Sequence, residues 1–177
     1  MPEVSYETSV VVNAPVDVVY DYIADFPRHV EWNHQPTRMI AVKEGPVQVG
    51  SQYQTYEKTA SNLSFGTKMM FAVMGPISKL MWGSADYTLA EITALEPNQR
   101  VAWKARAPST KKGDLMRMNW EILLQPQNGA TKVVQRCQIV PPTESPMFGM
   151  VNEGTAAQGC EEATANLQRM RSIIEGG

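Results

Sequence analysis

An alternation of apolar and polar residues with a period of two runs through most of the chain, from residue 37 to residue 139. Successive side chains of a β-strand point to opposite faces, so this period predicts strands with one buried face and one solvated face. The clearest alternation spans residues 116–124, where the apolar positions include Met118 and Trp120. We therefore expect an antiparallel sheet that is dry on one side and wet on the other.

Glycine, proline and asparagine residues divide this region into separate strands. Together with an alternating N-terminal segment, the pattern predicts strands at residues 4–12, 37–44, 51–58, 87–95, 100–107, 115–124 and 131–139. The pairs Pro97-Asn98 and Asn128-Gly129 are typical of tight turns, and they join the last three strands as hairpins.

Two short helices are expected between the first and second strands. Asn13 can cap the free N–H groups of a helix that has Pro15 in its first turn, where proline lacks only a donor that the helix does not use. Val19 and Ile23 then fall on one face of this helix. A second helical turn is expected at residues 27–32.

The C-terminal segment, residues 155–175, has apolar side chains at alternating steps of four and three, which predicts a long amphipathic helix. Its apolar stripe is small in the first half and large in the second: Ala156, Cys160 and Ala163, then Leu167, Met170 and Ile174. Such a helix seals against a curved sheet at its C-terminal end and leaves room at its N-terminal end. We therefore expect an apolar cavity there, and the alternative is a core filled by Trp103, Trp120, Met116 and Met118.

Length and charge restrict the class of protein. A chain of 177 residues predicts a single domain, residues 1–177. Sixteen basic and eighteen acidic residues give a formal charge of -2 without a basic stripe, so we expect no nucleic-acid partner. Residues 1–10 lack the basic and apolar regions of a secretion signal, and a cytoplasmic location is expected. Cys137 and Cys160 are predicted to be reduced, buried thiols, and no metal or other cofactor is expected.

Residues 68–82 hold four of the eleven methionines in a mostly apolar stretch. The stretch is too short, and too interrupted by Gly75-Pro76 and Lys79, to span a membrane, so no transmembrane segment is predicted. Methionine adapts to irregular apolar shapes, which suits a lid over a pocket, a core hairpin or the interface of a homodimer equally. A second flap is expected near residues 146–150, with burial in a dimer again the alternative.

Three segments resemble a known family: VVVNAPVDVVYDYIADFPRHVEWN at residues 10–33, ITALEPNQRVAWKA at residues 92–105 and NGATKVVQRCQI at residues 128–139. With the order of the expected elements, the chain resembles the SRPBCC superfamily of START and birch-pollen-allergen-like domains over nearly its whole length. Within that superfamily it is most similar to the polyketide cyclase/dehydrase-like group. The resemblance implies an α+β helix-grip fold, in which a curved antiparallel sheet of about seven strands wraps around a long C-terminal helix.

The resemblance also implies a deep hydrophobic pocket, which the superfamily uses for lipids, sterols, polyketides and plant hormones, with or without chemistry. The residues expected to line it are Trp103, Met118, Trp120, Gln135, Cys137, Cys160, Ala163 and Leu167. Gln135 shares a strand face with Val133, so its amide would be a buried hydrogen-bonding group for a ligand oxygen or for water.

Acid–base catalysis in such a pocket would need an inward Glu, His, Tyr or Arg side chain. Glu57 and Glu91 are weak candidates, since burial would raise the pKa of either carboxyl, but the alternation leaves the facing of strands 51–58 and 87–95 undecided. His29 and His34 flank Trp32 and are expected to be exposed or to cap a helical turn.

These observations support one leading hypothesis and two alternatives. The leading hypothesis is binding or transfer of a hydrophobic small molecule, a lipid, polyketide or aromatic compound, between the sheet and the C-terminal helix. One alternative is a polyketide cyclase or dehydratase that uses a cavity carboxylate. The other is a protein-interaction module of chaperone-activator or ribosome-association type, in which the methionine-rich stretch is an exposed apolar patch.

Overall fold

The computed structural model describes residues 4–34, 36–57, 83, 85–111, 113–140 and 153–176, without the side chains of Thr37 and Glu57. Within these residues, seven antiparallel strands form one sheet in the order β1-β7-β6-β5-β4-β3-β2. The strands are β1 (Val4–Val12), β2 (Pro36–Ala41), β3 (Gln52–Glu57), β4 (Thr88–Glu96), β5 (Arg100–Ser109), β6 (Gly113–Gln127) and β7 (Ala130–Val140).

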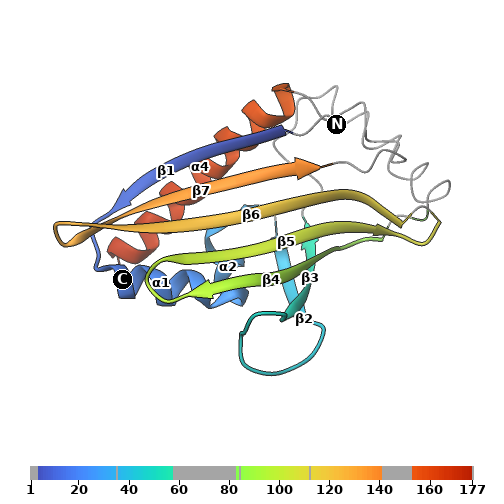
Figure 1. Ribbon diagram of the computed structural model, residues 1–177, viewed down its shortest axis with the longest axis horizontal. Helices are drawn as coiled ribbons and strands as arrows, with labels where there is room; N and C mark the ends of the chain where they lie inside the picture. Colours follow the sequence, from blue (N-terminus) through green and yellow to red (C-terminus); the bar gives the residue numbers. More distant parts are fainter. Residues whose placement is uncertain are drawn as a thin grey trace.

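Helical segments lie before the second strand and at the C-terminus. They are α1 (Val16–Ala24), the 3-10 turn η1 (Phe26–Arg28), α2 (His29–Trp32) and the long α4 (Glu153–Gly176). Figure 1 shows these helices on one face of the sheet, with α4 running behind β1 and β7 and with α1 and α2 behind the middle strands. The predicted α+β helix-grip fold, with a seven-stranded antiparallel sheet, is therefore confirmed.

The turns predicted at Pro97-Asn98 and Asn128-Gly129 form, the first between β4 and β5 and the second between β6 and β7. Asn98 has φ 61°, while Asn128 and Gly129 have φ 48° and 85°. Two successive residues with positive φ make the turn whose twist matches an antiparallel hairpin, and asparagine and glycine adopt that backbone most easily. With this turn, β6 and β7 pair from Gln127 and Ala130 up to Val140.

Strand ends differ from the sequence pattern in several places. The strand expected at residues 37–44 ends at Ala41, and residues 42–51 form a loop that projects from the sheet in Figure 1. Conversely, β6 extends the strand expected at residues 115–124 to Gly113–Gln127, because its first residues pair with β5 and its last residues pair with β7. Pairing with one neighbour is enough to maintain a strand where the apolar alternation has stopped.

The helix cap expected at Asn13 is wrong. The N-cap of α1 is Pro15, and no side chain bonds the first N–H groups. The backbone N–H of Asn13 instead donates to Glu175 Oε1 over 2.7 Å. Two residues too early to cap the helix, Asn13 thus ties the first strand to the last turn of α4.

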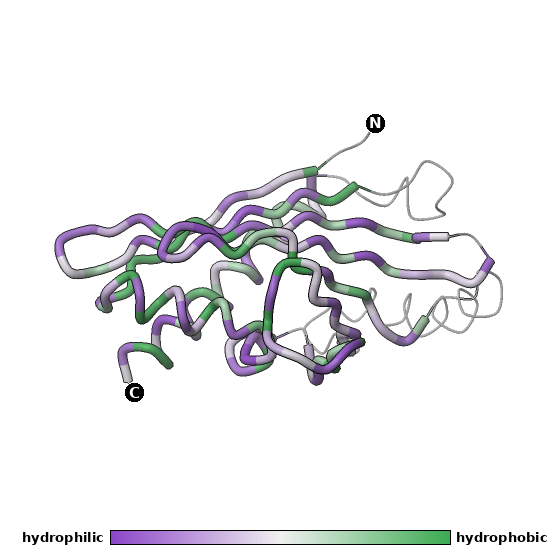
Figure 2. Tube along the Cα trace, turned by 60° about the horizontal axis from the view of Figure 1, so that its bottom comes forward, coloured by the Kyte–Doolittle hydropathy of each residue, from purple (hydrophilic) through white to green (hydrophobic). Residues whose placement is uncertain are grey.

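More and less buried residues alternate along much of the sheet, and Figure 2 shows hydrophilic and hydrophobic stretches alternating along the strands. The core joins Val12 and Val133 of the sheet to Ile23 of α1 and to Leu167 and Met170 of α4. We call the sheet face that carries this core the inward face. The large second half of the α4 stripe therefore does seal against the sheet.

The methionine-rich stretch, residues 68–82, and the expected flap at residues 146–150 lie outside the described residues. Neither expectation is tested by the fold. None of the helices in the described ranges has the length and apolar character needed to cross a membrane.

Candidate functional site

Strand registers place the candidate pocket residues of the sheet on the inward face. Trp103 pairs with Trp120 across β5 and β6, and Trp120 pairs with Cys137 across β6 and β7. Met118 and Gln135 lie two residues along the same strands, so they share this face. On α4, Ala163 and Leu167 are buried, while Cys160 is half-buried.

Aromatic rings cross the inward face in one continuous row, which we call the aromatic row. The Tyr6 ring meets Trp120 edge-on, with 6.2 Å between the ring centroids. Trp120 stacks on Trp103, with 5.9 Å between the centroids and 9° between the ring planes. The Phe26 ring then contacts the rings of Trp103 and Tyr53, with centroid separations of 5.4 Å and 5.1 Å. The aromatic row therefore runs from the edge strand β1 to β3, and its Phe26, Tyr53 and Trp103 rings are buried in the core.

Tyr6 was not among the residues expected to line the pocket. It lies under the first half of α4, where a Cβ added to Gly159 would meet Tyr6 Cε1 at 2.6 Å. Because Gly159 has no side chain, the helix can approach the ring this closely. The small half of the α4 stripe is thus occupied in part by Tyr6, which corrects the expectation that graded residue size alone leaves room there. The signal was available: Tyr6 alternates with Ser5 and Glu7 and points inward with Thr8.

The inward thiol and phenol beneath α4 are uncharged at neutral pH. Burial raises the pKa of the Cys137 thiol to about 12, partly offset by its hydrogen bond with Tyr6. Burial also raises the pKa of Tyr6, and the neighbouring Cys137 raises it further. Cys160, half-buried rather than buried as expected, directs its thiol at the Glu7 carbonyl over 3.6 Å. Tyr6 and Cys137 therefore present polar atoms without charge.

Three buried polar atoms have no hydrogen-bond partner among the described residues: Gln135 Oε1, Thr55 Oγ1 and Trp32 Nε1. Gln135 is 3% exposed and Thr55 is 8% exposed. The register of β3 with β4 puts Thr55 and Tyr53 on the inward face, which settles the facing that the sequence left undecided. Buried polar groups normally find partners, so these three atoms are exceptions among the described residues.

The structure does not bring Glu91 to the inward face. Glu91 pairs with Gln52 and Lys104 on the opposite face, where its carboxylate accepts from Lys104 Nζ and Gln52 Nε2 at 2.8 Å each. Those hydrogen bonds, first from Lys104 and then from Gln52, lower the pKa of Glu91, the reverse of the shift a buried acid would show. The side chain of Glu57 lies outside the described part. Within the described ranges, no three His, Cys, Asp or Glu side chains gather to hold a metal ion.

His29 is buried rather than exposed. Its ring lies 4.4 Å from Phe26 and 5.3 Å from Trp103, beside the aromatic row, and its Nε2 donates to the Ile23 carbonyl over 2.8 Å. Burial lowers the pKa of His29 to about 4, although the bond to Ile23 opposes the shift. His29 is therefore a neutral core residue, while His34 is exposed.

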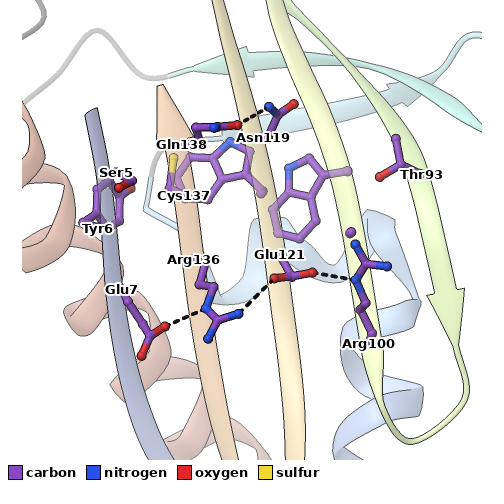
Figure 3. A pocket seen from close by; sticks show the side chains of 13 residues that line it. Ser5, Tyr6, Glu7, Thr93, Arg100, Asn119, Glu121, Arg136, Cys137 and Gln138 are labelled. Atoms are coloured by element: carbon purple, nitrogen blue, oxygen red, sulfur yellow. Dashed lines mark hydrogen bonds and ion pairs between the residues drawn. The ribbon is translucent and has the colours of Figure 1, made fainter. Parts of the chain in front are cut away.

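A trough of about 690 Å³ opens on the opposite, outward face of the sheet. In Figure 3 its side chains form a chain of ion pairs across four strands, Glu7–Arg136–Glu121–Arg100. We call this chain, continued by Glu96, the outer ladder. Although Trp103 and Trp120 also border the trough, its charged groups already satisfy one another. The trough is therefore a charged, self-paired surface rather than an apolar one.

Comparison with known proteins agrees with this arrangement. A family model described as polyketide cyclase/dehydrase and lipid transport matches residues 3–175. No curated protein sequence matches significantly.

Several solved structures share the fold at low sequence identity. Ara h 8.0201 aligns with a TM-score of 0.64 and 9% identity over 99% of both chains. The Zhui aromatase/cyclase from Streptomyces sp. R1128 aligns with a TM-score of 0.64 and 14% identity over 98% of this chain and 94% of that one. Protein CV1439 from Chromobacterium violaceum aligns with a TM-score of 0.59 and 13% identity over 97% of both. With a family model that spans almost the entire sequence, this chain belongs to the polyketide cyclase/dehydrase and lipid transport family of the SRPBCC superfamily.

Proposed function

We propose that this protein binds or transfers a hydrophobic small molecule, a lipid, polyketide or aromatic compound, between the inward face of the sheet and α4. The observation that carries the proposal is the aromatic row beside the unpartnered Gln135 Oε1. Burial of the guest against the rings supplies affinity, at about 25 cal/mol for each Å² removed from water. The amide of Gln135 orients the guest.

The guest enters beside the first half of α4. There Met116, Met118 and Trp120 are only half-buried, although they pack on Cys137 and Ile139. Under the second half of α4, by contrast, Leu167 and Met170 are fully buried. The proposed contact residues are Trp103, Met118, Trp120, Gln135, Cys137, Cys160, Ala163 and Leu167, with Tyr6 added.

Tryptophan fluorescence tests the proposal, because Trp103 and Trp120 would contact the guest. Titration with fatty acids, sterols and polycyclic aromatic compounds should give a saturable change for at least one class. Trp120→Ala should weaken that binding by at least about fivefold, roughly 1 kcal/mol. Val42→Ala, on the exposed loop after β2, is the matched control and should leave affinity unchanged. If no class produces saturation, the proposal is wrong.

A further inference from the structure

We infer that two copies of this chain associate through the free edge of β2, as antiparallel strands related by a two-fold axis at Ala41. The two sheets then continue into one. This contact lies outside the proposed ligand site and does not depend on the proposed function. Three observations support it: backbone groups that point away from the sheet, exposed apolar side chains beside them, and charges that match when the strand meets a copy of itself.

The two edges of the sheet differ in how they are covered (Figure 1). Along β1, α4 directs the Cys160 thiol at the Glu7 carbonyl and bonds Thr8 through the Thr164 hydroxyl. β2 forms the other edge, and within the described ranges no strand pairs with it on the side away from β3. An uncovered edge strand offers its N–H and C=O groups to another strand.

The pairing of β2 with β3 shows which backbone groups point to the free edge. The Val42 N–H donates to the Gln52 carbonyl over 2.8 Å, which continues the register of β2 and β3 one residue past Ala41. In an antiparallel pair, hydrogen-bonded residues alternate with residues whose N–H and C=O point the other way. Met39 and Ala41 are therefore the residues that offer both groups to a further strand.

The start of β2 is less suited to pairing than its end. Its first residue, Pro36, has no N–H group, and the register with β3 shifts between Pro36 and Arg38. A proline and an irregular register are features that protect an edge strand from further pairing. The open part of the edge therefore centres on Ala41.

Exposed apolar side chains lie on the outward face beside this edge. Ile40 is 39% exposed and Val42 is 53% exposed, whereas Met39 and Ala41 pack toward the core on the inward face. A two-fold axis at Ala41 puts Ile40 of each copy opposite Val42 of the other. These positions are not hydrogen-bonded across the new contact, and opposed side chains approach each other most closely at such positions.

Charge complementarity selects this register. The same axis puts Arg38 of each copy opposite Glu44 of the other, on the outward face, once at each end of the contact. Arg38 lies over the Tyr56 ring at 4.4 Å, and Glu44 is exposed on the bend after β2. An axis at Ile40 would put Arg38 opposite Val42 instead. Only the axis at Ala41 pairs apolar with apolar and opposite charges with each other, with Glu44 extended from β2 in the dimer.

The contact, residues 38–44 of each copy, is smaller than a standard interface, so the dimer is weak, with a Kd on the order of 100 µM. Sedimentation velocity between about 5 and 500 µM protein, chosen to bracket this Kd, should show a reversible monomer–dimer equilibrium. A chain that stays monomeric throughout this range would overturn the inference.

Charge exchange tests the register. Glu44→Arg should weaken association by at least about 10-fold, since like charges then meet at both ends of the contact. Because Glu44 is exposed, this variant should fold, which circular dichroism verifies. Adding Arg38→Glu restores opposite charges and should return the Kd to within about threefold of the wild type. Glu161→Arg, the same charge change at an exposed position of α4, is the matched control and should leave the Kd unchanged.

The outcomes of the exchange decide between this edge and any other contact. Weakening by Glu44→Arg with recovery in the double variant supports the pairing of β2 with its copy. If Glu44→Arg associates like the wild type, or if the double variant stays as weak as the single one, the copies meet elsewhere and the inference is wrong.

Discussion

Single atoms decide how α4 meets the sheet. Gly159 is the residue that lets the helix lie on Tyr6, since a Cβ there would come within 2.6 Å of the ring. Tyr6 is in turn held by Trp120 and by its hydrogen bond with Cys137. The ring therefore cannot simply swing aside, and the absence of one carbon atom fixes the separation of helix and sheet.

Gly159→Ala should destabilise the protein by about 1–3 kcal/mol, because overpacking outweighs the better helix propensity of alanine. In a Tyr6→Leu background the same change should reverse sign and stabilise by about 0.5–1 kcal/mol, since the obstruction is gone. Urea unfolding of the wild type, Gly159→Ala, Tyr6→Leu and the double variant measures this double-mutant cycle. Gly176→Ala, where no atom lies within 4 Å of the added Cβ, is the control. A loss that persists in the Tyr6→Leu background would contradict the contact.

The buried His29 makes stability depend on pH. Burial lowers its pKa from 6.5 to about 4, so the unfolded chain binds a proton that the folded protein excludes as pH falls through this range. Stability is therefore complete above pH 6.5 and is lost between pH 6.5 and pH 4, by about 3 kcal/mol in total. Urea unfolding of the wild type and His29→Gln at several pH values should show a shallower dependence in the variant. The exposed His34→Gln should retain the wild-type slope, and a variant slope equal to the wild type would refute this assignment.

At the residue scale, the alternation in the sequence predicted most of the sheet side of the site. Gln135 and Cys137 face inward beside Val133, as their spacing indicated. The facing of Thr55 and Glu91 could be assigned only from the pairing of β3 with β4. A strand in which polar residues occupy both faces does not reveal from its sequence which face is buried. The burial of His29 could not be predicted from the sequence. Only the packing of η1 and α2 on Trp103 shows that the His29 ring is enclosed.

Strand pairs stabilise the outward face through charge. The outer ladder places Glu121 between two arginines, 2.6 Å from Arg100 and 3.6 Å from Arg136, and Glu7 caps the β1 end at 2.6 Å from Arg136. Each member lies on a neighbouring strand, so the ladder reinforces the registers of β1, β7, β6 and β5.

Glu121→Gln should lower Tm by about 2 °C at low salt, since it removes the charge that two arginines share on a half-buried surface. Glu7→Gln, at the end of the ladder with one arginine contact, should lower Tm by less. In 1 M NaCl the difference between the two variants should disappear, because the Debye length falls to about 3 Å. Thermal unfolding at both salt concentrations measures this, and a difference that persists in 1 M NaCl would show that the ladder acts through packing instead.

At the element scale, the presence of each strand was easier to predict than the residues at which it begins and ends. The period of two and the turn residues located each of the described strands, but β6 is longer and β2 shorter than their apolar patterns. Strand ends depend on whether a neighbour continues the hydrogen bonding, and this information is not local in the sequence. The same limit explains Asn13, whose partner Glu175 lies at the far end of the chain.

The whole molecule is closed by contacts between its two ends. Thr8 bonds Thr164, the N–H of Asn13 bonds Glu175, and the Thr131 hydroxyl donates to the Ala14 carbonyl. These contacts join the first strand, the last strand and α4 into one core. The single domain expected for residues 1–177 consequently predicts one cooperative unfolding unit rather than a sheet from which α4 detaches.

Two signals report on different parts of that unit. Tryptophan fluorescence follows the four tryptophans, of which Trp32, Trp103 and Trp120 lie in or beside the aromatic row. Circular dichroism at 222 nm follows chiefly α4, the longest helix in the described part. In urea the two transitions should coincide, with the same midpoint and slope. Leu167→Ala, which empties a fully buried position of α4, should lower the free energy of unfolding by about 2–5 kcal/mol and shift both transitions equally. An earlier loss of helix signal, in the wild type or in the variant, would mean that α4 separates from a sheet that stays folded. The core shared by α4 and the sheet could then not be the source of the molecule's cooperativity, and the space between them would be open to solvent before global unfolding.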